Sequence, residues 1–324
     1  MIGQLGSELL ARRLHFVTGK GGVGKSTVAA ALALLAASQG KRVLAVEFDA
    51  KGDLASAFEH GPVGFDPTPV APGVHALSMD TEASLREYLR LNLKIPVFGR
   101  IGPVAKTFDF LASAAPGIKE ILTVGKVCWE VRESIAGRSD WDVVVVDATA
   151  TGHIVGELDA PRAIQELVQV GMIRSQTDWM VEILSDPAIT ALHVVTTPEE
   201  MPVRETIDLV GRVREQLDVP LGIVVVNRVL PELFTRAEEA QFEALRSGAP
   251  LSVLQRALGP RAIDVLDAAE LAVNLRRVRA GHLAELRDEI DLPLVYVPYL
   301  FGRGSGLRIV RRVETALAEE LALA

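Results

Sequence analysis

One segment of eight residues constrains the fold of this chain more than any other. Residues 19–26 read Gly-Lys-Gly-Gly-Val-Gly-Lys-Ser, which matches the pattern G-x-x-x-x-G-K-[ST] in full. A β-branched run, Leu14–Thr18, precedes the segment, and a helix rich in small residues is predicted over Thr27–Ser38. Glycines let successive backbone N–H groups turn inward, and the following helix N-terminus adds positive potential. The segment therefore predicts a phosphate-binding loop between a strand and a helix.

The motif also predicts a role for each polar side chain. Lys25 is expected to reach the β- and γ-phosphates of a nucleotide, and the Ser26 hydroxyl to bind Mg²⁺. The remaining nucleotide contacts are expected along the loop and at the start of the helix. The predicted nucleotide-binding residues here are Gly19, Lys20, Gly21, Gly22, Val23, Gly24, Lys25, Ser26 and Thr27.

Short apolar runs alternate with helical stretches along the chain. This alternation predicts an α/β fold, a P-loop NTPase with a mostly parallel sheet and helices on both faces. Val143–Val146 is apolar without alternation, as expected of a strand covered on both faces. The predicted strands are Leu14–Thr18, Val43–Phe48, Val74–Ser78, Val143–Asp147, Ala191–Thr196, Ile223–Asn227 and Leu294–Pro298.

Three connections are too long to be simple crossovers. We expect residues 1–324 to form one domain, with a helical cap subdomain over about residues 84–138 and 154–190. Both cap segments should border the carboxyl ends of strands, where ligands bind in parallel sheets. The predicted cap helices are Ser84–Leu93, Ile118–Ile135 and Pro161–Gly171.

A further helical insertion is expected over about residues 232–290. It should have a buried and an exposed face. Leu283, Leu286 and Ile290 form one apolar stripe at helical spacing. Arg276, Arg277 and Arg279 are expected to be solvated.

Charge and cysteine content limit the partners and the cellular compartment. Acidic residues outnumber basic ones by 42 to 34, giving a net charge of −8. That balance argues against nucleic acid as a partner, because such binding requires a basic face. A single cysteine, Cys128, excludes an internal disulfide and a Cys-x-x-Cys zinc site, and fits a reducing cytosol. With no signal peptide or spanning segment evident, we expect a cytoplasmic location, or a peripheral one at a membrane.

Asp147 ends the buried run Val143–Val146, the usual position of an acid that holds Mg²⁺ directly or through water. The segment from Asp147 to His153 resembles the D-T-A-P-T-G-H switch of the arsenite-pump and guided-entry tail-anchored-protein ATPases. Ala150 stands where that family has proline. His153 either signals the nucleotide state or is an ordinary loop residue.

Lys20 gives the phosphate loop the deviant form K-G-G-x-G-K-[ST]. This form resembles the class of dimeric ATPases that includes the partitioning proteins, the nitrogenase iron protein and the arsenite-pump family. The resemblance implies that Lys20 crosses a dimer interface to the partner's nucleotide, in the manner of an arginine finger. The alternative is a solvated loop lysine.

The segment Glu47–Phe58 resembles the family's first switch, T-D-P-A-H-x-L-x-x-x-F. Asp49 falls on the water-positioning aspartate, so the resemblance implies that it orients the attacking water. The proline and histidine of the family pattern are replaced by Ala50 and Gly52. Asp53 either takes part in this switch or caps a helix.

Two further segments resemble the family's base-binding elements. Asn227, in Val225–Arg228, falls on the residue that reads the adenine edge, which implies ATP as the nucleotide. Pro298, in Val297–Leu300, and the later Gly306-Leu307 resemble the closing base-binding loop. The segment Pro116–Glu120 matches the family's P-G-I-x-E helix start.

The resemblance implies Mg²⁺-dependent ATP hydrolysis by a homodimer, or by a heterodimer with a paralogue, with Lys20, Lys25 and Asp49 as the catalytic residues. It is closest to the single-domain actinobacterial branch of anion-transporting ATPases. The cap would then handle a membrane-protein client or a membrane transport partner. Candidate residues for its apolar groove, which could equally pack the core of the cap, are Phe108, Phe110, Leu111, Ile118, Ile121 and Leu122.

Two other functions are compatible with the same motifs. One is a positioning ATPase of the partitioning type, which would bind DNA or membrane. The long insertions and the acidic balance argue against it. The other is a nucleotide-binding regulatory subunit with little turnover.

Overall fold

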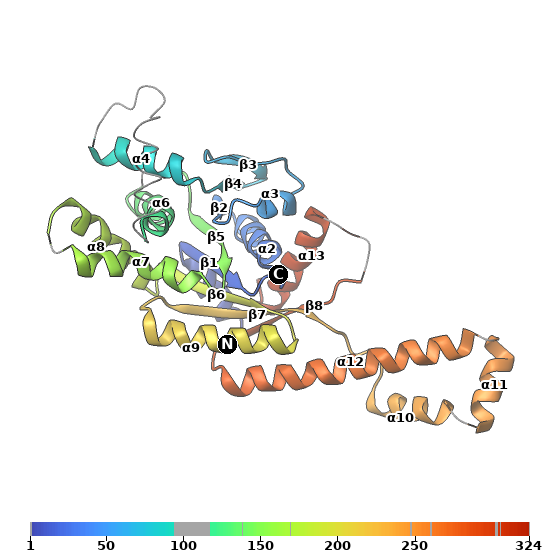
Figure 1. The fold of residues 1–324 in the computed structure, drawn as a ribbon. Helices are drawn as coiled ribbons and strands as arrows, with labels where there is room; N and C mark the ends of the chain where they lie inside the picture. The colour runs from blue at the N-terminus through green and yellow to red at the C-terminus, as the bar shows by residue number, and fades with distance from the viewer. Residues whose placement is uncertain are drawn as a thin grey trace.

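An eight-stranded sheet forms the centre of the protein (Figure 1). The computed structural model describes residues 2–93, 117–137, 139–168, 170–246, 248–259, 261–301, 304 and 306–323. The strands are β1 (Leu14–Gly19), β2 (Val43–Glu47), β3 (Thr68–Ala71), β4 (Val74–Ser78), β5 (Val143–Ala150), β6 (Thr190–Thr196), β7 (Leu221–Val229) and β8 (Leu294–Pro298). Their order in the sheet is β3-β4-β2-β5-β1-β6-β7-β8. All neighbours are parallel except β3 and β4.

The predicted α/β architecture and all seven predicted strands are confirmed. The eighth strand, β3, is a four-residue edge strand that the sequence analysis missed. It contains Pro69 and is only partly buried, so it lacks the apolar run typical of the other strands. It pairs with β4 as an antiparallel hairpin.

The strand order brings the predicted site segments to one edge of the sheet. β5 lies between β1 and β2, with Phe16 opposite Val146 on one side and Glu47 opposite Asp147 on the other. The carboxyl ends of these three strands therefore lie side by side. The phosphate loop follows β1, the first switch follows β2, and Asp147 lies near the end of β5.

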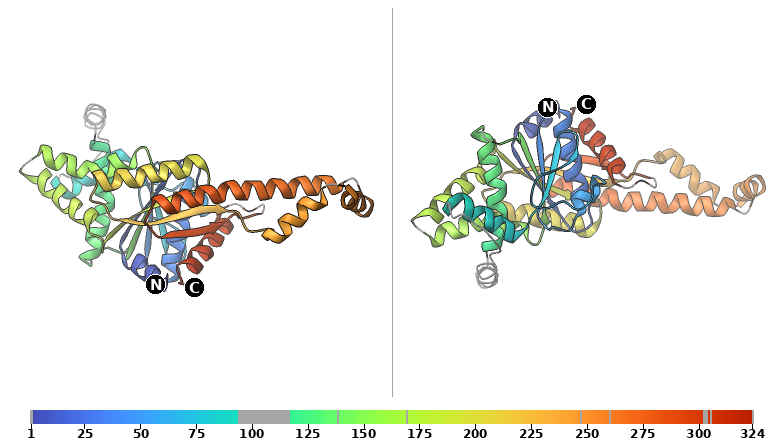
Figure 2. Two further views of the ribbon diagram at one scale, coloured as in Figure 1. Left: turned by 90° about the horizontal axis from the view of Figure 1, so that it is seen from below. Right: turned by 90° about the horizontal axis from the view of Figure 1, so that it is seen from above.

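Helices cover both faces of the sheet, because alternate residues of its strands point into two separate cores. On β5, Val144 and Val146 face one core, while Val143 and Val145 face the other. The second core is closed by α1 (Ile2–Ala11), α2 (Lys25–Ser38) and α13 (Leu307–Glu320), and the first by α6 (Ile118–Ile135), α7 (Ile154–Leu167), α8 (Met172–Ser185) and α9 (Glu200–Gln216). The two chain ends lie close together on the side of α1 and α13 (Figure 2).

Two predicted helix boundaries are wrong, for identifiable reasons. The helix predicted over Pro161–Gly171 is α7, which begins at Ile154, ends at Leu167 and contains Pro161 in its interior. Proline favours the first turn of a helix, but Pro161 is buried within this one. The helix predicted from Ser84 is α4 (Thr81–Leu93), which begins earlier because the Asp80 carboxylate accepts a hydrogen bond from the backbone N–H of Ala83 (2.6 Å).

The third insertion forms an arm that projects away from the sheet (Figures 1 and 2). It consists of α10 (Arg236–Leu245), α11 (Gly248–Leu258) and the 29-residue α12 (Arg261–Glu289). The predicted apolar stripe is confirmed: Leu286 and Ile290 are buried in the core, and Leu283 packs against it.

The arginine prediction on α12 is only partly correct. Arg277 is exposed, as expected, and forms an ion pair with Glu239. Arg276 is half-buried and pairs with Glu232. The side chain of Arg279 is 21% exposed and pairs with Glu199 at 3.3 Å, because α12 packs against α9 there.

Parts of the predicted cap lie outside the described residues, so its boundaries stay a prediction. Phe108, Phe110 and Leu111 are among the residues outside. Ile121 packs against the core and Leu122 is buried, which fits the structural alternative to a groove. Within the described ranges, every helix falls short of the length and apolar character that a membrane span requires.

Candidate active site

The phosphate loop turns between β1 and α2 through backbone angles that favour glycine. Gly22 (φ 88°) and Gly24 (φ 98°) both have left-handed conformations. A Cβ atom on Gly19 would lie 2.1 Å from the Val195 carbonyl oxygen, and one on Gly24 would lie 2.5 Å from the Asn227 side chain. Helix α2 begins directly at Lys25, so its N-terminus opens onto the loop. This arrangement suits the binding of an anion.

An open cleft of about 400 Å³ lies over this loop. Its floor is made by Gly22, Gly24 and the start of α2. One side is the helix α3 (Asp53–Ala57), and the other is the start of α13, where Gly306 lies. The cleft therefore joins three segments that the sequence analysis assigned to one site. The lining residues are Gly22, Gly24, Lys25, Ser26, Thr27, Asp53, Ser56, Ala57, Gly306, Ile309 and Val310.

Asp147 lies beside the loop and has an incomplete set of partners. The Ser26 hydroxyl donates a hydrogen bond to its carboxylate, while its Oδ1 atom is buried and has no hydrogen-bond partner. Burial raises the pKa of Asp147 to about 7, against the opposing effects of the Ser26 hydrogen bond and the Lys25 charge. Mg²⁺ prefers one or two carboxylates plus phosphate oxygens, so Ser26 and Asp147 fit this ion.

The first switch is organised by Glu47, a residue the sequence analysis did not assign. Its buried carboxylate accepts hydrogen bonds from the backbone N–H groups of Gly52 (3.1 Å), Asp53 (2.7 Å) and Leu54 (3.3 Å). Glu47 therefore caps α3, and the alternative in which Asp53 caps this helix is wrong. A lone acid at the end of the apolar strand β2 was the available signal.

Asp49 lies in the exposed turn between Glu47 and α3. Its carboxylate forms an ion pair with Lys51 at 2.8 Å, and its side chain is 39% exposed. Ala50, which replaces the family's proline, has a left-handed conformation with φ at 50°. Asp49 is not among the residues that line the cleft.

The end of β5 and the loop after it, residues 151–153, are held by two helices. Thr149, at the end of β5, donates a hydrogen bond to Glu157 of α7 (2.7 Å). Thr151 donates to Glu205 of α9 (3.1 Å), and its carbonyl oxygen accepts from Arg212 (2.9 Å). His153 is exposed and makes no side-chain cap to α7.

Lys20 extends away from the cleft toward α9. Its ammonium forms an ion pair with Glu205 of the same chain, and its side chain is 32% exposed. It is thus a paired rather than a freely solvated lysine, while its reach to a partner's nucleotide stays a prediction.

The two residues predicted to contact the base, Asn227 and Pro298, differ in how close they lie to the phosphate loop. Asn227 is buried, and its Nδ2 donates to the Val23 carbonyl (2.8 Å), while its Oδ1 accepts from the Arg228 backbone N–H (2.9 Å). It is therefore bonded directly to the phosphate loop. Pro298 lies exposed at the end of β8 and outside the cleft lining.

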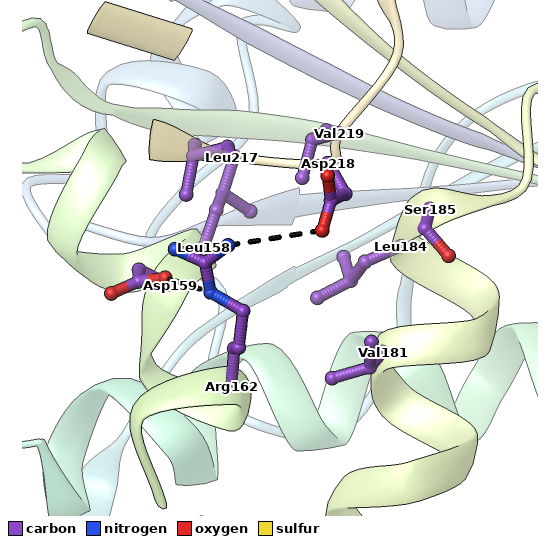
Figure 3. Close-up of a pocket in the computed structure, with 9 residues that line it drawn as sticks. All are labelled: Leu158, Asp159, Arg162, Val181, Leu184, Ser185, Leu217, Asp218 and Val219. Atoms are coloured by element: carbon purple, nitrogen blue, oxygen red, sulfur yellow. Dashed lines mark hydrogen bonds and ion pairs between the residues drawn. The ribbon is translucent and has the colours of Figure 1, made fainter. Parts of the chain in front are cut away.

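A second, much smaller cavity lies between α7, α8 and the segment before β7 (Figure 3). Arg162 extends across it, with ion pairs to Asp159 (3.0 Å) and Asp218 (3.7 Å). Its volume of about 20 Å³ is room for roughly one water molecule. The cleft over the phosphate loop is therefore the candidate active site.

Comparison with known proteins decides the family. The sequence profile of the anion-transporting ATPases matches residues 12–181 and 170–248. The chain belongs to this family. It is an ATPase, as the sequence resemblance implied.

The similar proteins include relatives that match over most of their own length and relatives that match over about half of it or less. ATPase BagA of Mycobacterium tuberculosis is 35% identical over 260 residues, covering 75% of this chain and 74% of the relative. The arsenical pump-driving ATPase of Acidiphilium multivorum is 28% identical over 316 residues, covering 88% of this chain and 51% of the relative. A putative arsenical pump-driving ATPase of Halobacterium salinarum is 26% identical over 308 residues, covering 88% of this chain and 41% of the relative.

Apart from Glu47, which lies in the first switch itself, the residues that sequence reasoning missed act on the family's motifs from elsewhere in the chain. Glu205 and Arg212 lie 54 and 61 residues from Thr151, which both contact. Glu157 lies closer, eight residues after Thr149. Nothing in the local spacing of the α9 residues distinguishes them from exposed helix positions, so only the fold identifies them.

Proposed function

We propose that this ATPase binds and hydrolyses MgATP in the cleft over residues 19–26. The observation that carries the proposal is the unpartnered Oδ1 of Asp147, buried beside Ser26 and close enough to Lys25 for that charge to lower its pKa. An acid, a hydroxyl and a lysine in that arrangement suit a metal ion and a polyphosphate together.

Each residue then has a defined task. The backbone N–H groups of the loop and the Lys25 ammonium bind phosphate oxygens and stabilise the charge that develops during transfer. Mg²⁺, held by Ser26 and Asp147, would neutralise charge on the phosphates. Asp49 orients and polarises the attacking water, which requires it to leave Lys51 and turn toward the cleft.

We further propose that two chains act together, as a homodimer or with a paralogue, with Lys20 reaching the partner's nucleotide. The hydrogen bond from Thr149 to Glu157 offers a path from the site to α7. Leu167 (83% exposed), the last residue of α7, and Val170 (81% exposed), which follows the helix, present apolar surface. These residues support contact between the cap and a membrane-protein client or membrane partner. The proposed location is cytoplasmic, with contact at a membrane surface.

Steady-state ATPase rates test the hydrolysis. Lys25→Ala and Asp49→Asn should each lower turnover by at least roughly a hundredfold, because each removes a group that acts on the transition state. Lys41→Ala is the matched control, since Lys41 follows the far end of α2 and should leave turnover unchanged. ATP binding without measurable wild-type turnover would instead favour the low-turnover regulatory role.

Client handling needs its own test. Asp49→Asn protein with ATP bound should enrich membrane proteins in a pull-down relative to Lys25→Ala protein. Equal recovery by the two variants would argue against a nucleotide-dependent client.

A further inference from the structure

One carboxylate joins two parts of the site that are far apart in the sequence. Glu205, on α9, forms an ion pair with the Lys20 ammonium through Oε1. Its other oxygen, Oε2, accepts the hydrogen bond from the Thr151 hydroxyl at 3.1 Å. Glu205 therefore bridges the start of the phosphate loop and the loop after β5.

A second side chain of α9 contacts the same residue, Thr151. Arg212 donates to the carbonyl oxygen of Thr151 at 2.9 Å. Glu205 and Arg212 are seven residues apart, two turns along the same helix face. Thr151 is thus held at its hydroxyl and at its carbonyl, so movement of the loop after β5 must change the surroundings of Glu205.

The pair also determines which way Lys20 points. Lys20 is absent from the cleft lining, whereas Lys25 of the same loop is part of it. The Lys20 ammonium lowers the pKa of Glu205, so this carboxylate is charged at neutral pH. Glu205 and a nucleotide phosphate are both anions that can bind the Lys20 ammonium, so they compete for it.

We propose that Glu205 is a positioning residue that holds the Lys20 ammonium against α9, outside the phosphate cleft, and so limits how readily Lys20 reaches a phosphate of either chain. Movement of Thr151 removes one support of Glu205 and favours release of Lys20. This inference rests on the proposed nucleotide function and adds a regulatory contact to it.

The direct test is a double-mutant cycle on nucleotide affinity. Calorimetry with a non-hydrolysable ATP analogue and Mg²⁺ is run on the wild type, Glu205→Gln, Lys20→Ala and the double variant. Glutamine keeps an oxygen acceptor for Thr151 and removes the charge that holds Lys20. Affinity should rise about two- to fivefold, the range of a partly exposed ion pair. In the Lys20→Ala background the same substitution should have no effect.

Two further variants separate this role from a structural one. Glu205→Asp should act in the same direction, because the shorter side chain cannot reach Lys20 and Thr151 together. Glu200→Gln is the matched control: Glu200 lies on the same helix, is exposed and pairs with Arg204 at 3.1 Å. Thermal unfolding of each variant confirms that the fold is intact.

The possible failures are distinct. Wild-type affinity in Glu205→Gln, or an equal change in the Lys20→Ala background, would overturn the role of Glu205 and leave the proposed function standing. A wild-type protein that binds no analogue would overturn both.

Discussion

His15 and His193 meet edge to edge, with ring centroids 5.3 Å apart, ring planes inclined by only 16° and both side chains buried. The backbone N–H of Ile223 donates to Nδ1 of His193 (3.2 Å), which places the proton of His193 on Nε2. That nitrogen lies 3.0 Å from Nδ1 of His15, whose own Nε2 faces the Arg12 carbonyl (3.3 Å). Two neutral rings therefore satisfy every hydrogen bond, and a protonated pair would not.

The first prediction concerns acid stability. Burial lowers the pKa of His15 to about 4 from an ordinary 6.5, and that of His193 well below 6.5. At pH values between the folded and unfolded pKa of these histidines, the unfolded chain binds more protons than the folded protein. The histidines therefore make the free energy of unfolding fall as the pH drops below 6.5. The raised pKa of Asp147 acts in the opposite direction over part of this range.

Comparison with a variant isolates the histidine contribution. In His15→Gln, the slope of unfolding free energy against pH between pH 4.5 and 6 should fall by about 1 kcal/mol per pH unit, slightly less than the effect of one full proton. Urea unfolding at several pH values measures this slope. His60→Gln is the control, because His60 is exposed. An unchanged slope in His15→Gln would show that the pair is not neutral in the folded protein.

The second prediction concerns Glu47. Glu47→Ala leaves the backbone N–H groups of Gly52, Asp53 and Leu54 without their acceptor. We expect the first switch to open more easily by about 1–3 kcal/mol, the cost of unmade hydrogen bonds at a buried position. Hydrogen exchange of these three amides should accelerate by about five- to 150-fold, the equivalent of that free energy. Glu47→Gln, which keeps one acceptor oxygen, should give exchange rates between those of the wild type and Glu47→Ala. Protection equal to that of the wild type in Glu47→Ala would contradict the capping role.

The third prediction concerns the contact between α4 and α6. Lys126 is 9% exposed and lies between Glu87 (2.9 Å) and Glu130 (2.8 Å). Lys126→Met leaves two carboxylates facing each other in a partly buried position, so we expect a loss of about 3 kcal/mol in unfolding free energy. The exposed pair between Arg86 and Glu82 on α4 is the control, and Arg86→Met should cost under ~0.5 kcal/mol. Urea unfolding measures both losses. Similar losses in the two variants would refute the idea that the partly buried Lys126 contributes more to stability than the exposed Arg86.

The sequence predicted those features whose physical cause is local. The phosphate loop requires only glycines, a lysine and a hydroxyl between a strand and a helix, all within eight residues. Buried parallel strands such as β5 show up as continuous β-branched runs. Edge strand β3 and the interior Pro161 of α7 were missed because tertiary packing overrode their local preferences.

The contacts that join the site together could not be predicted in this way. Glu205 looks like any exposed position of an amphipathic helix until the fold places it against Lys20, 185 residues away. Asn227 illustrates a different gap: the resemblance predicted that it lies at the site, and the structure adds that it bonds to the loop, 204 residues earlier, at Val23. Side-chain partners at such separations depend on the register of whole strands.

The last prediction follows from the hydrogen bond between the Asn227 side chain and the Val23 carbonyl. Asn227→Asp keeps an acceptor for the Arg228 backbone N–H but cannot donate to the Val23 carbonyl, so the carboxylate and this carbonyl oxygen repel each other. We expect ATP affinity to fall by about tenfold, equivalent to one lost hydrogen bond beside an unsatisfied buried group. Asn274→Asp is the matched control, because Asn274 is exposed on α12.

The nucleotide used in the measurement separates two roles of Asn227. If its second amide N–H contacts the adenine edge, as the family resemblance implies, the preference for ATP over GTP should fall together with affinity. We expect this outcome, because Nδ2 lies next to Gly24, and Gly24 lines the cleft. Equal losses for ATP and GTP would instead limit Asn227 to ordering the phosphate loop.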